Sequence, residues 1–125
     1  MLTYLQGTTR SDIHMATHQT ARFSIDSKLS HERAVHRISR YLKGTNNKGF
    51  IFRPKKVKGL ECYGDADFTG GWYKANASNP EAAMSRTGYM IKYANYPVLW
   101  CSKLQSEIAL STIEAEYIAL SQSMR

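Results

Sequence analysis

The spacing of apolar residues changes once along the chain, and this change most constrains the fold. Residues 30–43 place apolar side chains three and four positions apart, whereas residues 60–69 alternate apolar and polar side chains. The first pattern is typical of a helix and the second of a strand. The same two patterns predict two more helices and three more strands, at residues 11–24, 112–124, 50–52, 87–94 and 98–102. The sequence therefore predicts an α+β chain.

The helix predicted at residues 30–43 has two contrasting faces. Ser30 is expected to cap it and Gly44 to end it. Apolar side chains line one face, namely Ala34, Val35, Ile38, Tyr41 and Leu42. Basic-type side chains follow the other, namely Arg33, His36, Arg37, Arg40 and Lys43. Since each neutralised phosphate releases counterions, this edge is a candidate nucleic-acid contact through Arg33, Arg37, Arg40 and Lys43; the alternative is a solvated face.

Charge divides the chain into two parts. Residues 1–59 contain 12 Lys and Arg against 3 acids, whereas residues 60–125 contain 5 against 7. A Pro- and Lys-rich stretch separates the parts, so we expect segments at 1–58 and 59–125. No run of 18 apolar residues and no signal-peptide pattern occurs, which predicts an intracellular chain without a membrane segment.

Two acidic pairs form the candidate site. Asp65 and Asp67 lie on one face of the strand at 60–69, where aspartate is unfavourable and like charges repel. Glu114 fits a capping box with Ser111 and so has a structural role.

Glu116 has no such role. A helical wheel places it at the edge of a stripe that we expect to be buried: Ile113, Tyr117, Leu120 and Met124. An ionised carboxylate is costly there unless it is paired or bound to a cation. Glu116 is therefore the functional candidate; the alternative is a salt bridge to a nearby Arg or Lys.

Carboxylates from a strand and a later helix suit a divalent metal. Mg²⁺ prefers oxygen ligands, commonly a few carboxylates plus water and phosphate, and Mn²⁺ is an alternative. If the strand and helix pack together, Asp65 and Glu116 are the predicted metal-binding and catalytic residues of phosphodiester hydrolysis.

Six blocks in order resemble the reverse transcriptase–ribonuclease H region of copia-type retrotransposon polyproteins. The blocks are Thr9–Ile13, Arg40–Thr45, Gly64–Phe68, Ser85–Tyr89, Trp100–Gln105 and Glu114–Tyr117. The resemblance implies that residues 1–58 are the C-terminal, thumb- or connection-like tail of the reverse transcriptase. It also implies that residues 59–125 are an incomplete ribonuclease-H-like domain with three antiparallel strands and the first helix.

The same resemblance assigns Mg²⁺ binding and cleavage of the RNA strand of RNA–DNA hybrids to Asp65 and Glu116. Asp67 becomes a supporting or folding residue. The implied partners are RNA–DNA hybrid or another nucleic acid and the remainder of the polyprotein, with no membrane. The implied location is the cytoplasm, in virus-like particles, or the nucleus.

Three positions depart from the family pattern without removing a metal ligand, namely Ser11, Leu104 and Ile113. The chain also lacks a Y-x-D-D polymerase motif and stops at Arg125, before the family's remaining metal-binding aspartates. We therefore expect a polyprotein fragment that is inactive alone. The alternative is a non-catalytic nucleic-acid-binding remnant of a transposon gene, whose acids serve only caps and salt bridges.

Overall fold

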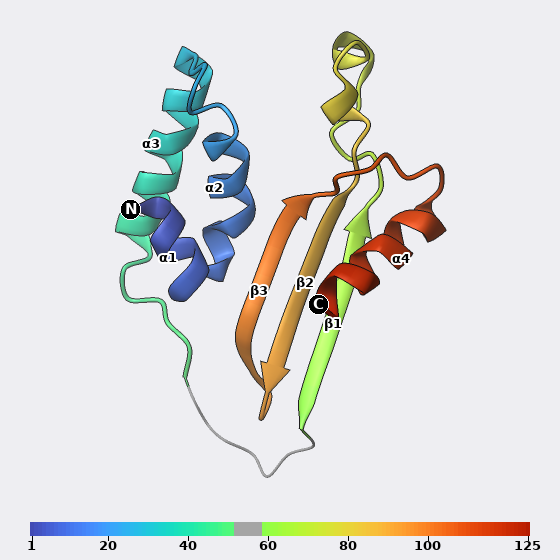
Figure 1. Cartoon of the computed structure of the whole chain (residues 1–125). Helices are drawn as coiled ribbons and strands as arrows, with labels where there is room; N and C mark the ends of the chain where they lie inside the picture. The colour runs from blue at the N-terminus through green and yellow to red at the C-terminus, as the bar shows by residue number, and fades with distance from the viewer. Residues whose placement is uncertain (52–58) are drawn as a thin grey trace. The chain divides into compact units, whose positions relative to one another are not determined.

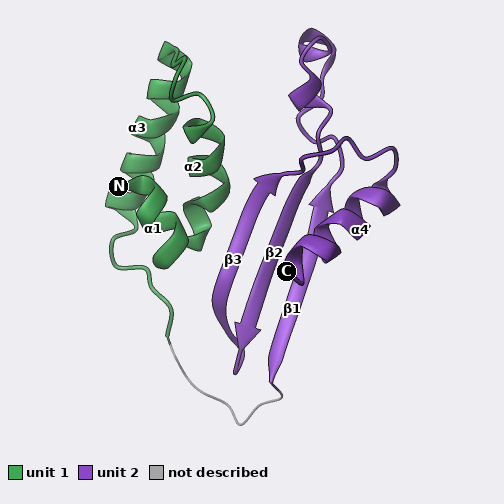
Figure 2. Cartoon of the chain, viewed as in Figure 1, with its two compact units in different colours: residues 1–52 green, residues 53–125 purple. Residues whose placement is uncertain are grey.

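The computed structural model describes residues 1–51 and 59–125, which contain the predicted α+β mixture of helices and a three-stranded antiparallel sheet (Figure 1). Contacts divide the chain into two compact units, unit 1 (Met1–Phe52) and unit 2 (Arg53–Arg125) (Figure 2). The boundary predicted after residue 58, like the Pro- and Lys-rich stretch before it, falls outside the described residues. Within the described part of the chain, no helix is long and apolar enough to cross a membrane.

Unit 1 consists of three helices. They are α1 (Leu2–Thr8), α2 (His14–Ala21) and α3 (Leu29–Gly44), with a 3₁₀ turn at Ser11–Ile13. The predicted helix at 11–24 is thus shorter and begins as a 3₁₀ turn, and α1 was not predicted. The most buried residues come from the turn, α2 and α3: Ile13, Thr17 and Ile38 are 2%, 3% and 6% exposed.

The start of α3 differs from the prediction. The helix begins at Leu29, so Ser30 lies inside it and is not the cap. Instead, the backbone N–H of Lys28 donates to His31 Nδ1 at 3.0 Å. The predicted end at Gly44 is confirmed. The strand predicted at 50–52 is wrong for residues 50 and 51, which have no strand, and Phe52 is not described.

Unit 2 contains a sheet with the strand order β1 (Leu60–Asp67), β2 (Arg86–Tyr93) and β3 (Tyr96–Leu104). Both pairings are antiparallel, so β1 and β3 each have one unpaired edge within the described sheet. The turn between β2 and β3 is Ala94–Asn95, whose φ values of +50° and +68° suit a tight two-residue hairpin. The predicted strands at 87–94 and 98–102 left residues 95–97 between them, but Tyr96 and Pro97 already belong to β3.

Helix α4 (Thr112–Ser123) packs on β1 and β2 (Figure 1). Its N-terminus is capped as predicted, because Ser111 Oγ accepts the backbone N–H of Glu114 at 3.1 Å. The Glu114 side chain reaches one residue further back than predicted and accepts the N–H of Leu110 at 2.7 Å.

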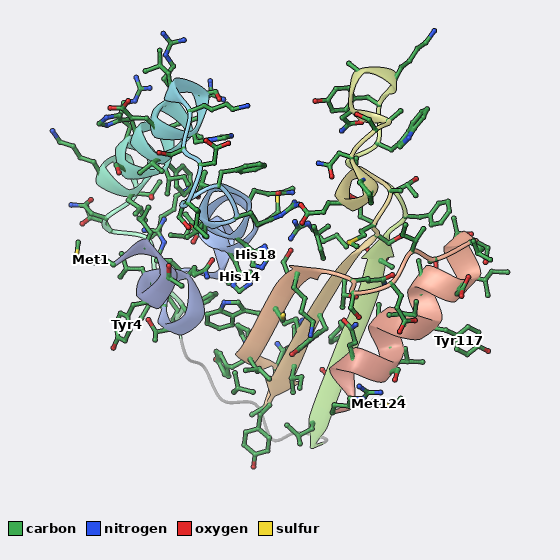
Figure 3. All side chains as sticks on the ribbon, turned by 45° about the horizontal axis from the view of Figure 1, so that its top comes forward. Met1, Tyr4, His14, His18, Tyr117 and Met124 are labelled. Carbon is green, nitrogen blue, oxygen red and sulfur yellow. The ribbon has the colours of Figure 1, made fainter. Side chains whose placement is uncertain are left out.

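The predicted buried stripe of α4 is wrong. Its four members are 48–72% exposed, namely Ile113, Tyr117, Leu120 and Met124. Small residues face the sheet instead: Ala115, Ala119 and Ser123 are at most 7% exposed. Their spacing of four forms a narrow ridge that lets the helix lie close to the strands. Figure 3 shows Tyr117 pointing away from the sheet.

A buried polar side chain links the end of β3 to α4. Gln105 is 1% exposed, and its Nε2 donates to the backbone oxygen of Ala115 at 2.8 Å and to Thr87 Oγ1 at 3.2 Å. Thr87 itself is fully buried. Since buried donors are costly to leave unpaired, these two bonds fix the position of α4 over the sheet.

Candidate carboxylate site and basic helix edge

Asp65 and Glu116 line the same hollow on unit 2. The carboxylate hollow has a volume of about 440 Å³ and is lined by Gly64, Asp65, Ile113, Glu116, Tyr117 and Leu120. It therefore lies between β1 and the exposed side of α4. The strand and helix pack together as the site hypothesis required.

Asp65 and Glu116 come to the hollow from different elements, β1 and α4. A Cβ on Gly64 would lie 3.8 Å from Ser123 Oγ, so position 64 faces α4. Because successive residues alternate in a strand, Asp65 lies on the opposite face of β1. Asp65 can still border a hollow beside α4, because β1 is an edge strand of the described sheet and no further strand covers its outer side. Glu116 follows Ala115, which faces the sheet, and so lies at the flank of the helix.

Asp65 and Glu116 are both exposed, and neither side chain has a hydrogen bond or ion pair with another described residue. The salt bridge considered as the alternative for Glu116 is thus absent from the described part of the chain. Their oxygen atoms are free to bind water or a cation. The original argument for Glu116 was nevertheless wrong, because the neighbouring stripe is exposed and burial does not penalise this charge.

Asp67 lies at the end of β1, where its carboxylate packs against Gly70. A Cβ at position 70 would collide with both Asp67 oxygens, so this turn requires glycine when the aspartate holds that orientation. Thr69, between them, has φ +47°, which is rare for a β-branched residue. Asp67 therefore borders a tight, strained turn, and it does not line the carboxylate hollow.

The carboxylate hollow partly fits a divalent metal. Two exposed acidic residues are part of its lining, and no group of three His, Cys, Asp or Glu residues that could hold a metal exists among residues 1–51 and 59–125. Magnesium sites commonly use one or two carboxylates, with water and substrate phosphate as the other ligands. Asp65 and Glu116 match that minimal set.

The basic edge of α3 is fully presented to solvent. Its candidate residues are all exposed, namely Arg33, Arg37, Arg40 and Lys43. His36 belongs to the same edge, and its Nε2 lies 3.7 Å from Glu32 Oε1. Among the described residues, Glu32 is the acid beside this edge. The basic side chains outnumber it, so the surface remains strongly cationic.

One polar network in unit 1 was missed by the sequence reasoning. Arg10 donates to both oxygens of Asp12, at 2.9 and 2.8 Å, and to Thr45 Oγ1 at 2.7 Å. The Tyr41 hydroxyl also donates to Asp12, at 2.8 Å. The Arg10 hydrogen bonds lower the pKa of Asp12 from 3.8 to about 2, with further lowering from Tyr41. The network joins the first two sequence blocks, Thr9–Ile13 and Arg40–Thr45, and its role is to hold the turn against α3.

Three similar proteins place the chain among known sequences. Secreted RxLR effector protein 161 of Plasmopara viticola is 35% identical over 120 residues, which is 96% of this chain and 79% of that protein. The retrovirus-related Pol polyprotein from transposon TNT 1-94 of Nicotiana tabacum is 36% identical over 122 residues. The Pol polyprotein from transposon RE1 of Arabidopsis thaliana is 33% identical over 109 residues. The chain belongs to the same family as Secreted RxLR effector protein 161, and it is similar over most of its length to a segment of retrotransposon Pol polyproteins.

The similarity to the Pol polyproteins covers a short segment of much longer proteins. The matches span 98% and 87% of this chain but 8% and 7% of the TNT 1-94 and RE1 polyproteins. Activities of a whole Pol polyprotein therefore do not pass to this segment by similarity alone. No protein-family profile and no solved structure matches the chain.

Proposed function

We propose that this Pol polyprotein segment contains the end of a reverse transcriptase and the first part of a ribonuclease H domain. In the complete protein, Asp65 and Glu116 would hold Mg²⁺ or Mn²⁺ for cleavage of RNA in RNA–DNA hybrids. The observation that supports this most is the shared hollow, which is lined by Asp65 of β1 and Glu116 of α4, residues 51 positions apart in the sequence.

The proposed chemistry divides between the ion and the protein. A bound divalent ion would activate water and stabilise the leaving oxygen. Asp65 and Glu116 would hold it at the edge of β1. The basic edge of α3 would contact phosphates without reading sequence. Since two carboxylates leave most metal positions to water and substrate, we expect this chain alone to bind metal weakly and to cleave hybrid little or not at all.

Metal binding can be tested on the chain itself. Mn²⁺ titration followed by NMR should broaden backbone signals near Asp65 and Glu116 first. Asp65→Asn and Glu116→Gln should each lower the Mn²⁺ affinity about tenfold, equivalent to about 1.4 kcal/mol. Glu107→Gln is the matched control, because Glu107 is an exposed acid of the same unit that does not line the hollow. Equal affinities for all three variants and the unchanged chain would reject the metal site.

A non-catalytic nucleic-acid-binding segment is the second candidate. It is favoured by the exposed basic edge of α3, combined with the absence of a third metal-binding side chain near Asp65 and Glu116 among the described residues. Under this proposal, hybrid binding weakens with salt and with Arg37→Ala, whereas divalent metal changes neither the affinity nor the signals of unit 2.

A further inference from the structure

Helix α4 carries an apolar stripe that the described part of the chain leaves uncovered. Its members are 66%, 70%, 48% and 72% exposed, namely Ile113, Tyr117, Leu120 and Met124. We call these four residues the α4 stripe. Leu110, just before the helix, is 87% exposed and adds to the same surface. Together the five residues expose roughly 600 Å², which is the upper end for the largest apolar patch of a soluble monomer.

The spacing of the α4 stripe suits a second helix. Its members follow one another at intervals of four, three and four residues, which places them along one seam of the helix. Such a seam interdigitates with a similar seam on another helix. No other helix in the described part of the chain carries four large apolar side chains that are each 48% or more exposed. The matching seam is therefore the same stripe on a second copy, and a twofold axis pairs two such stripes symmetrically.

Charge along α4 favours one direction of pairing. Glu114 and Glu116 lie in its N-terminal half and Arg125 follows its C-cap, and all three residues are exposed. A parallel pair would gather four carboxylates at one end, where they repel. An antiparallel pair separates them, opposes the two helix dipoles and brings Arg125 of each copy to the acidic end of the other.

We propose that two copies of the chain associate through antiparallel α4 stripes, and that this pairing closes the carboxylate hollow. Ile113 then lies against the partner's Met124, and Tyr117 against the partner's Leu120. Three residues that line the hollow belong to the stripe, namely Ile113, Tyr117 and Leu120. A helix seated on them covers the hollow that Asp65 and Glu116 also line.

The size of the α4 stripe sets the strength of this association. Two stripes bury about 1,000 Å² in total, which is the lower limit for a specific interface. The pairing is therefore weak, with a Kd of about 10–100 µM. The inference goes beyond the proposed metal chemistry and does not depend on it.

Sedimentation velocity of the whole chain tests the association. Between about 1 and 300 µM, the unchanged chain should pass from monomer to dimer. Tyr117→Ser should raise the Kd about tenfold or more, because it removes the aromatic member of the seam. The matched control is Tyr4→Ser, since Tyr4 is 72% exposed but belongs to α1 of unit 1. It should leave the Kd unchanged. A chain that stays monomeric throughout, or that dimerises equally well with Tyr117→Ser, would overturn the inference.

Cross-linking tests the direction of pairing. Ile113→Cys and Met124→Cys are made in a chain whose own thiols are removed by Cys62→Ser and Cys101→Ser. A disulfide should form when the two variants are mixed and not within either variant alone. The reason is that equivalent positions of an antiparallel pair lie about 16 Å apart along the axis. Disulfides within each variant alone would show parallel pairing and overturn the arrangement.

Carbodiimide labelling of carboxylates, read by mass spectrometry, tests closure of the hollow without any metal. Asp65 and Glu116 should be labelled at about 1 µM and protected at about 300 µM, where the dimer forms. Asp26, an exposed acid of unit 1, should be labelled equally at both concentrations. Dimerisation without protection of Asp65 and Glu116 would overturn closure of the hollow. Since no metal is present, failure of the proposed metal site would leave these results unchanged.

Discussion

Truncation of Gln105 should loosen α4 from the sheet by an amount that the structure sets. Gln105→Ala removes two hydrogen bonds made by Nε2, at about 1 kcal/mol each. It also removes one buried methylene, Cγ, at about 0.8 kcal/mol. The Oε1 atom is buried without a partner, so its removal offsets about 1 kcal/mol of this loss. We therefore expect the free energy of unfolding to fall by about 2 kcal/mol.

Two further variants separate the contributions. Gln105→Met keeps the volume and loses only the polar atoms, so its cost should be about 1 kcal/mol. Gln105→Glu places a carboxylate against the oxygen of Ala115 and should cost more than the alanine variant at neutral pH. Burial raises the pKa of such a carboxyl, so its stability should recover in acid, where the protonated group can donate, and be lost as pH rises.

Urea unfolding followed by tryptophan fluorescence measures these changes in the right place, because both tryptophans, Trp72 and Trp100, belong to unit 2. If Gln105→Ala and Gln105→Met cost the same, the methylene contribution is wrong. If Gln105→Ala unfolds within about 0.5 kcal/mol of the unchanged chain, Gln105 does not fix α4 at all.

Three other predictions concern separate parts of the chain. Asp12→Asn should destabilise unit 1 by about 1 kcal/mol at pH 7, a value reduced from the full pKa shift because the Asp12 side chain is 37% exposed. Since folding lowers the pKa of Asp12, this stability is present above about pH 4 and is lost as the pH falls toward 2. Acid titration followed by circular dichroism should show this loss in the unchanged chain and not in Asp12→Asn. Ala94→Gly should stabilise the hairpin by about 0.5–1 kcal/mol in urea, because φ is +50° there, whereas Ala75→Gly should not. Tyr117→Ser should change the free energy of unfolding by less than about 0.5 kcal/mol, whereas Ala119→Leu should lower it by about 1–3 kcal/mol. A larger loss for Tyr117→Ser than for Ala119→Leu would mean that the Tyr117 face of α4 is the buried one, as the sequence predicted.

The sequence predicted the elements of unit 2 well because each has strong local signals. Alternation predicted β1, and the Ser111 cap predicted the start of α4. Which face of α4 is buried could not be predicted in the same way. Hydrophobicity favours the face with Tyr117, but the sheet accepts the face with Ala115 and Ala119, because small side chains allow closer approach. That choice depends on the shape of the partner surface, which no helical pattern contains.

The pairing of Asp65 with Glu116 in a metal site stays a prediction, and part of the reasoning that led to it was wrong. Asp65 and Glu116 do line one hollow, but Glu116 is exposed and its charge is not forced to find a partner. The network of Arg10, Asp12 and Tyr41 escaped prediction because its members are up to 31 positions apart. A pair of polar residues at that separation has no local pattern, and only tertiary contact reveals it.

The acids in the six sequence blocks can now be sorted by what the fold uses them for. Asp12 is bound by Arg10 and Tyr41, and Glu114 caps α4, so both have structural roles that explain them. The other three are Asp65, Asp67 and Glu116, whose side chains have no hydrogen bond or ion pair to any described residue. Asp67 packs against Gly70 in a strained turn, which leaves two. Folding therefore explains neither Asp65 nor Glu116, and these are the two that share a hollow, which is why metal binding should be sought there first.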